Sequence, residues 1–239
     1  MNNSEQHWYA HEQDWKDGII GFTNDKIISA LLADPTTRVN IALAGGTTPL
    51  KLYGAFAQTW TGRRGSERIN FFLTDERDVP IEHAHCNGYQ IKALMQGLNT
   101  HIFDPKQPQG YSQYEHTIEL CLQEGQGVFD LILLGMGEDG HIASLFPGFR
   151  AETDPQPVFY PTQGPENTRR YSLSLSALAR SRELALMIGP QPPKHQIIES
   201  LGQPASENPL PIHQLLAART RSTHWFIQKA NDYHPVPRL

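Results

Sequence analysis

Short unbroken apolar runs alternate along this chain with longer stretches in which apolar residues recur at helical spacing. The apolar runs predict strands over residues 39–43, 69–73, 131–134, 171–175, 184–188 and 225–227. Helical spacing predicts helices over residues 14–32, from Pro49 onward, and over 87–95 and 195–201. A strand covered on both faces reads as a continuous apolar run. Strands alternating with helices therefore predict an α/β fold of three layers, with a mostly parallel sheet and helices on both faces.

Length and composition predict a single domain. The chain has 239 residues, of which 38% are hydrophobic, and its charges are well mixed. One large core is expected at this size, so we assign residues 1–239 to one α/β domain. The proline-rich segments 155–165 and 190–193 are expected to be loops within that domain.

Charge and cysteine usage exclude several classes of protein. The formal net charge of −5 offers no basic field to nucleic acid, although a small anion can still bind at a local site. No apolar run approaches the length of a membrane span, and the N-terminal residues lack a signal-peptide pattern. Cys86 and Cys121 form no CxxC motif, which suits a reducing compartment. We expect a cytoplasmic protein without nucleic-acid or membrane partners.

The strand over 131–134 ends in a glycine-rich turn that carries Glu138, Asp139 and His141. Open α/β sheets hold their ligands at the carboxyl ends of strands. A histidine two residues after an aspartate can act there as a general base once a carboxylate or carbonyl sets its tautomer. Two plainer interpretations stay open: Asp139 caps a short helix that follows, or the turn only exposes solvated carboxylates.

The same turn spells GxGxxG with Gly135, Gly137 and Gly140. This spacing occurs in dinucleotide-binding folds, but there a long helix follows the glycines. Here Pro147 and Gly148 end any helix after little more than a turn. We therefore expect no nicotinamide or flavin cofactor.

Two further strand ends are polar. Gly45, Gly46, Thr47 and Thr48 connect a strand to a helix start, where free N–H groups and the helix dipole favour a phosphate. The loop lacks a P-loop lysine, and by itself it could be ordinary turn chemistry. The segment 74–77 (TDER) ends a neighbouring strand, so the fold should bring it beside the glycine loop and His141; alone it could be an ion-paired surface loop.

A possible metal cluster lies just after this segment. It consists of Glu82, His83, His85 and Cys86. No second ligand pair with zinc-like spacing appears in the sequence, so we interpret the cluster as a polar loop and expect no metal.

Taken together, the polar loops resemble the 6-phosphogluconolactonase family over nearly the whole chain. The matching segments are LAGGTTP (43–49), TDER (74–77) with CNGY (86–89), GMGEDGHIASLFPG (135–148) and RRYSLSLSAL (169–178). The resemblance implies a NagB-like, Rossmann-like fold. It also implies hydrolysis of 6-phospho-D-glucono-1,5-lactone to 6-phosphogluconate in the pentose phosphate pathway, without a required cofactor.

The resemblance also implies roles for individual residues. His141 would activate the attacking water, with Asp139 as the orienting carboxylate. The phosphate would be held by Gly45, Gly46, Thr47 and Thr48, with positive charge from Arg170 and Lys194. Asp75 and Arg77 would face the sugar ring or the developing oxyanion. The expected partner is a small sugar phosphate, and the protein would be a monomer or a small homo-oligomer.

The chain departs from the family pattern at several positions, and one departure matches a related family with a different activity. Thr47 and Cys86 stand where serine is common, and the 189–194 segment is longer than usual, which leaves the placement of Lys194 open. Ile142 matches the related glucosamine-6-phosphate deaminases, but their signature carries a glutamate five residues after the histidine. Here that residue is Phe146, which cannot relay a proton, so lactone hydrolysis is favoured.

A non-catalytic sugar-phosphate sensor is the alternative from another class, since effector domains of some transcription regulators resemble this fold. The N-terminal helix leaves no room for a helix-turn-helix, and the presence of Asp139 and His141 also disfavours this hypothesis.

Overall fold

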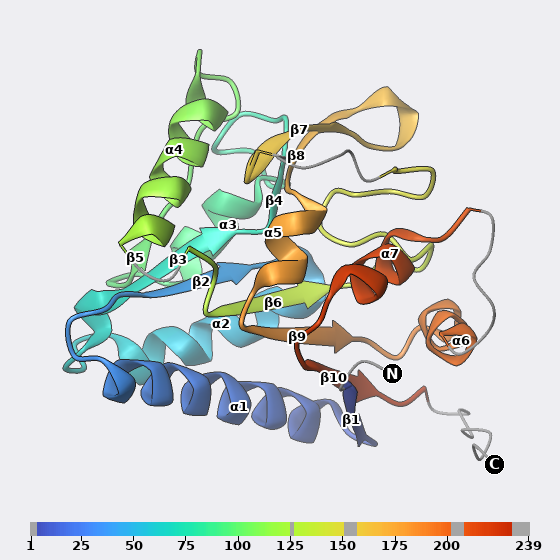
Figure 1. Ribbon diagram of the computed structural model, residues 1–239, viewed down its shortest axis with the longest axis horizontal. Helices are drawn as coiled ribbons and strands as arrows, with labels where there is room; N and C mark the ends of the chain where they lie inside the picture. The colour runs from blue at the N-terminus through green and yellow to red at the C-terminus, as the bar shows by residue number, and fades with distance from the viewer. Residues whose placement is uncertain (1–3, 125–126, 151–156, 202–207, 231–239) are drawn as a thin grey trace.

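A computed structural model describes residues 4–124, 127–150, 157–201 and 208–230 (Figure 1). Its centre is a seven-stranded sheet in the order β1-β10-β9-β6-β2-β3-β5, in which every neighbouring pair is parallel. The strands are β1 (Ser4–Tyr9), β2 (Val39–Leu43), β3 (Ile69–Leu73), β5 (Asn99–Thr100), β6 (Leu131–Gly135), β9 (Glu183–Ile188) and β10 (Thr223–Gln228). The predicted parallel sheet is thus confirmed.

Helices cover both faces of this sheet. They are α1 (Glu12–Ala33), α2 (Thr47–Trp60), α3 (Asn87–Leu94), α4 (Gly110–Gln123), α5 (Leu175–Arg180), α6 (Pro192–Ser200) and α7 (Pro211–Ala218), with 3₁₀ turns η1 (Ser66–Arg68) and η2 (Pro165–Asn167). Figure 1 shows α1 below the sheet and α4, α5 and α7 above it. The three-layer α/β prediction is confirmed. Within the described residues, no helix combines the length and apolar character needed to cross a membrane.

The core forms where the apolar runs predicted it. Every residue of β2 and β3 is buried, as are the first four residues of β6. In α1 the buried positions recur every four residues from Trp15 to Leu31, so one stripe of the helix faces the sheet. The Trp15 indole also donates a hydrogen bond of 2.9 Å to the carbonyl of Phe226, which ties α1 to β10.

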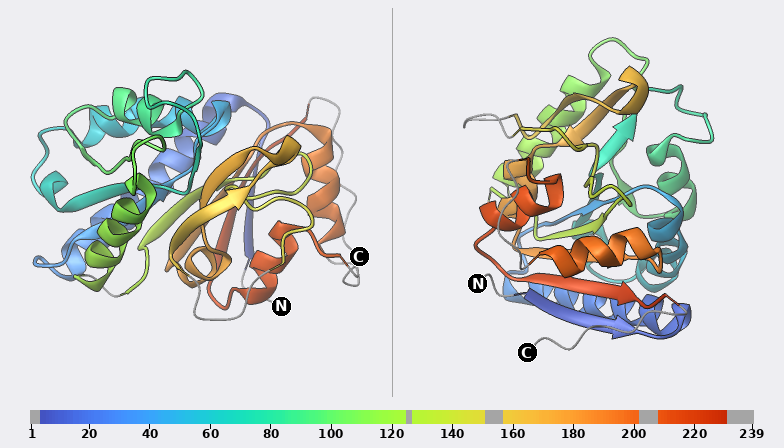
Figure 2. Two further views of the ribbon diagram at one scale, coloured as in Figure 1. Left: turned by 90° about the horizontal axis from the view of Figure 1, so that it is seen from above. Right: turned by 90° about the vertical axis from the view of Figure 1, so that its right-hand side faces the viewer.

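A second, three-stranded antiparallel sheet contains β4 (Asp75–Arg77), β8 (Arg169–Leu173) and β7 (Phe159–Gln163). It lies over the same face as α4, α5 and α7 (Figure 2). The strand predicted over 171–175 belongs to this sheet instead of the parallel one, and it ends at Leu173. Ser174 stops the strand because its hydroxyl caps α5, accepting a bond of 3.2 Å from the Ala177 amide.

Other predictions need correction as well. Residues 75–77 form a strand instead of a loop, and α6 begins at Pro192 inside a segment predicted as a loop. In the proline-rich segment 155–165, β7 occupies 159–163, while residues 155 and 156 lie outside the described residues. The short helix expected after Asp139 is not formed within residues 140–150, where isolated bridges join Met136 to Ile142 and Ile142 to Leu145. The strand β1 was not predicted because its half-exposed residues form no apolar run.

A ladder of asparagines fixes the pairing of three strands near their amino ends. Asn40, Asn70 and Asn99 occupy matching positions on β2, β3 and β5. The Asn70 amide donates to Asn40 Oδ1 over 2.9 Å, and Asn99 donates to Asn70 Oδ1 over 2.5 Å. Asn40 and Asn70 are buried, so each depends on its neighbours for hydrogen bonds.

We predict that Asn70→Ala lowers the free energy of unfolding by about 1–3 kcal/mol, because it leaves the buried Asn40 Oδ1 without its donor. Urea denaturation monitored by circular dichroism measures this. Leu32→Ala is the control, since Leu32 is 79% exposed and its loss should change stability by under about 0.5 kcal/mol. Equal stability of the two variants would contradict the ladder's role.

Candidate active site

A cleft of about 200 Å³ opens at the carboxyl ends of β2, β6 and β9. The loops after β2 and β6, the strand β4 and the first turns of α2, α3 and α6 form its walls, and Met187 of β9 lines it as well. Most of the predicted site residues line it: Gly45, Gly46, Thr47, Thr48, Asp75, Arg77, His141 and Lys194. The convergence expected from the strand ends is therefore observed.

The glycine loop delivers the start of α2 to this cleft. Gly46 is the N-cap with φ of +93°, a left-handed conformation that favours glycine, and no side chain caps the helix there. A side chain on Gly45 would collide with the Asn87 amide. The first N–H groups of a helix have no partner within it, so this turn presents free donors and the positive end of the helix dipole. The arrangement suits an anion.

His141 and Asp139 form a hydrogen-bonded pair in the turn after β6. Asp139 Oδ1 lies 2.6 Å from His141 Nδ1 and also accepts the His141 backbone N–H over 3.1 Å. A carboxylate only accepts hydrogen bonds, so Nδ1 carries the proton and Nε2 keeps its lone pair. Gly137 permits this approach, because any Cβ there would collide with the imidazole and with Asp139 Oδ1. Gly140 has φ of +80°, a left-handed conformation that favours glycine. Gly137 and Gly140 of the GxGxxG motif are thus required by the geometry of the turn itself.

Asp139 and Phe146 line a neighbouring cavity of about 640 Å³ instead of the cleft itself. Asp139 therefore does not line the cleft itself, but it is hydrogen-bonded to His141, which does. The Phe146 ring lies 4.7 Å from the imidazole, between centroids, at an angle of 37°. An apolar ring thus covers part of the histidine.

Asp75 and Arg77 are held by Ser144 and Asn87, which were not predicted as site residues. Asp75 Oδ2 accepts a bond of 2.9 Å from the Ser144 hydroxyl. The Asn87 side chain accepts from Arg77 over 2.6 Å and donates to the Asp75 carbonyl over 2.9 Å. Asn87 also lines the cleft. Both residues lie in segments that match the family, CNGY for Asn87 and GMGEDGHIASLFPG for Ser144, so these segments were the usable signal.

Buried Glu76 supports this group from below. Its carboxylate accepts backbone N–H bonds of 2.7, 2.8 and 2.7 Å from Arg77, Asn87 and Gly88. Burial raises the pKa of Glu76, while these hydrogen bonds oppose the rise. The Cys86 thiol lies 3.3 Å from the same carboxylate, and burial together with Glu76 raises its pKa to about 12. Cys86 therefore packs beneath the site as a neutral thiol.

The two predicted cations differ in position. Lys194, in the first turn of α6, lines the cleft, and burial lowers its pKa while Glu138 opposes that effect. Arg170 on β8 pairs with Arg77 on β4 and does not belong to the cleft wall. Burial and the charge of Arg77 lower the pKa of Arg170. Its role in phosphate binding stays a prediction.

The fold and the cleft define a class: an α/β protein whose parallel sheet carries an uncapped helix start beside a His–Asp pair. Residues 21–225 match the family described as "Glucosamine-6-phosphate isomerases/6-phosphogluconolactonase". The chain belongs to this family.

Two relatives and one solved structure in this family carry the name 6-phosphogluconolactonase. The 6-phosphogluconolactonase of Thermotoga maritima is 30% identical over 227 residues, covering 90% of this chain and 96% of that protein. The enzyme of that name from Haemophilus influenzae is 26% identical over 200 residues, covering 80% and 85%. The crystal structure of the Thermotoga maritima protein matches with a TM-score of 0.79 and 25% identity, covering 95% of this chain and 100% of that one.

We predict that neutral His141 carries its proton on Nδ1 and that Asp139→Ala weakens this preference, because the carboxylate that fixes the tautomer is lost. Nitrogen NMR of the imidazole distinguishes the two ring nitrogens. The exposed His116 of α4 serves as the internal reference. A proton on Nε2 in the unmodified protein would rule out the proposed orientation.

Proposed function

We propose that this protein hydrolyses 6-phospho-D-glucono-1,5-lactone to 6-phosphogluconate, a step of the pentose phosphate pathway. One observation carries the proposal: a histidine backed by a carboxylate shares a small cleft with an anion-binding helix start and a lysine. Relatives that align over nearly their full length bear the name of this activity, which supports the substrate assignment.

The phosphate would occupy the start of α2. Backbone N–H groups of the 45–48 loop and the hydroxyls of Thr47 and Thr48 can donate to its oxygens, and the Lys194 ammonium adds charge. This grip lies away from the reacting carbonyl. Its binding energy would hold the lactone carbonyl within reach of His141.

The chemical step would use His141 as a general base. Nε2 takes a proton from water while the water oxygen bonds to the lactone carbonyl carbon, and the carbonyl electron pair moves onto its oxygen. The tetrahedral intermediate then collapses, the bond to the ring oxygen breaks, and the imidazolium returns its proton to that oxygen. Asp139 stabilises the imidazolium between these steps. The reaction uses only water and the protein's own groups, so it requires no cofactor.

Arg77 and Asp75 would also contact the substrate, Arg77 at the carbonyl oxygen and Asp75 at the sugar hydroxyls. The Arg77 guanidinium is held in the cleft by Asn87 and can stabilise the developing oxyanion. The Asp75 carboxylate keeps lone pairs beyond those used by Ser144 and Thr74, so it can accept bonds from sugar hydroxyls.

The related deaminase activity fits this site less well. Amino-sugar ring opening and isomerisation require a proton relay at the position five residues after the histidine, by the family resemblance. Phe146 occupies that position and its ring lies against His141, where it offers no proton donor or acceptor. Hydrolysis, which needs one base and one water, is compatible with this apolar neighbour.

We further propose that residues 1–239 act as one domain in the cytoplasm, as a monomer or small homo-oligomer, on a small sugar phosphate alone. The free thiols of Cys86 and Cys121 support a reducing compartment.

We predict that His141→Ala lowers kcat for the lactone by about 10²–10⁴, because the general base is lost. The assay follows acid release from freshly generated 6-phosphogluconolactone, corrected for spontaneous hydrolysis. His116→Ala, on the exposed face of α4, should retain full activity. No activity above background in the unmodified protein, or an unaffected His141→Ala, would refute the proposal, and ammonia release from glucosamine 6-phosphate would move the assignment to the deaminases.

We predict that Lys194→Gln weakens 6-phosphogluconate binding by about tenfold or more, since a charged hydrogen bond is worth about 1.5–3 kcal/mol. Titration calorimetry measures this, with Lys92→Gln on the surface of α3 as the control. Burial lowers the pKa of Lys194, and only the protonated form attracts phosphate. Affinity should therefore fall as the pH rises through that lowered pKa, and Lys194→Gln should lack this fall. The same pH profile in both proteins would exclude Lys194 from the phosphate site.

A further inference from the structure

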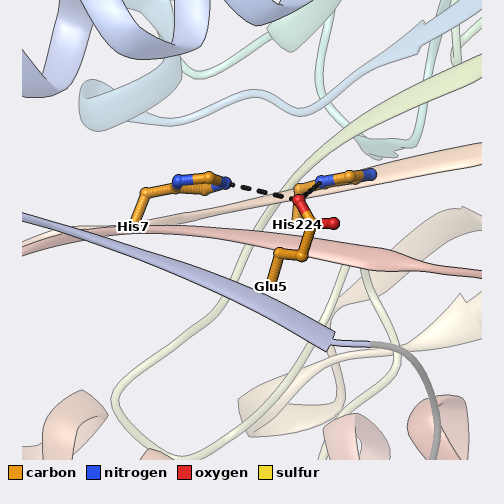
Figure 3. A group of neighbouring side chains, drawn as sticks. All are labelled: Glu5, His7 and His224. Atoms are coloured by element: carbon orange, nitrogen blue, oxygen red, sulfur yellow. Dashed lines mark ion pairs between the residues drawn. The ribbon is translucent and has the colours of Figure 1, made fainter.

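Three side chains that can bind metals meet at the sheet end opposite the cleft. Glu5 and His7 lie on the edge strand β1, and His224 lies on the adjacent β10 (Figure 3). Glu5 pairs in register with His224, and His7 follows two residues later, so all three project from one face of the sheet. Glu5 and His224 are each the second residue of their strands, whereas the cleft lies at the carboxyl ends.

The spacing of these groups is close to that of a metal's ligand shell. Glu5 Oε2 lies 3.3 Å from His224 Nδ1 and 3.9 Å from His7 Nε2, and the ligand atoms all lie within 4.8 Å of one another. Ligands about 2.1 Å from a tetrahedral zinc ion stand about 3.4 Å apart. Small rotations of the half-exposed His7 and Glu5 side chains would suffice to match this value.

A neighbouring carboxylate prepares His224 for this role. His224 Nε2 lies 3.0 Å from Glu183 Oε2, and Glu183 in turn accepts a bond of 2.7 Å from Lys26 on α1. A proton donated from Nε2 leaves the Nδ1 lone pair directed at Glu5. Metal-bound histidines commonly show this arrangement, in which the other ring nitrogen donates to a carboxylate. His224 is 7% exposed, and its buried Nδ1 has no hydrogen-bond partner among the described residues.

We propose that Glu5, His7 and His224 bind one divalent transition-metal ion, with Zn²⁺ as the best fit. Two imidazole nitrogens and one carboxylate oxygen suit zinc, whereas Mg²⁺ and Ca²⁺ prefer oxygen ligands alone. With neutral imidazoles, the carboxylates of Glu5 and Glu183 outweigh the single charge of Lys26, so the surroundings favour a cation. Water would complete a tetrahedral shell.

The bound ion would join the edge strand to the rest of the sheet. β1 is the edge strand and pairs with β10, and Glu5 and His7 are both partly exposed. A metal bridging the two strands would stabilise the folded state, because the unfolded chain does not hold these ligands together. Lactone hydrolysis should not depend on the ion, since the cleft is at the other end of the strands.

The test is titration of the metal-free protein with Zn²⁺ by calorimetry, combined with thermal unfolding and the visible spectrum of the Co²⁺ form. We expect saturable one-to-one binding, a higher Tm with Zn²⁺, and the intense absorption of tetrahedral cobalt. His7→Gln should weaken binding by about 100-fold and abolish the Tm increase. His11→Gln is the matched control, because His11 is exposed near the same strand and lies outside the cluster.

Four further variants separate this site from other histidines and from a simple ion pair. Glu183→Ala should weaken Zn²⁺ binding by about 10–100-fold, as loss of such outer carboxylates does. Lys26→Ala, which removes the other partner of Glu183, should bind almost normally. His141→Ala and His83→Gln should bind as the unmodified protein does. Absence of one-to-one binding, or unchanged affinity in His7→Gln, would overturn the proposal and leave His224 as an imidazole between two carboxylates.

Discussion

The parallel direction of the central sheet is the constraint on which the rest of this molecule depends. When every strand runs the same way, the loop after each strand leaves from one edge, whatever the distance between those loops in the sequence. The glycine loop after β2, strand β4 after β3 and the His141 turn after β6 meet for this reason. The position of the cleft therefore follows from the direction of the strands and does not depend on any single contact.

Glycines that allow side chains to lie close to the backbone then determine which groups line the cleft. Gly45 leaves space for the Asn87 amide, and Gly137 leaves space for the His141 ring and its carboxylate partner. Buried Glu76 accepts hydrogen bonds from the backbone N–H groups of Arg77, Asn87 and Gly88, and so fixes the backbone beneath the cleft. The position of the Arg77 and Asn87 side chains at the cleft therefore depends on a buried carboxylate that does not line the cleft itself.

The two ends of the sheet carry different polar chemistry. At the carboxyl ends, free helix N–H groups and Lys194 favour an anion. At the amino ends, the asparagine side chains bond to one another and to the Cys121 carbonyl, whereas the ligand atoms of Glu5, His7 and His224 lie within 4.8 Å of one another. The proposed anion site and the proposed cation site thus lie at opposite ends of the strands.

Local sequence determined the buried strands β2, β3, β6 and β9, the helix α1, and the polar loops, because apolar periodicity and glycine turns act over a few residues. It also identified most of the cleft wall and the family. Only the tertiary structure decided that residues 169–173 leave the parallel sheet, that Arg170 lies against Arg77, and that Asn87 links Asp75 to Arg77. The meeting of Glu5 with His224 is the clearest case, since these residues come from opposite ends of the chain and only strand register brings them together.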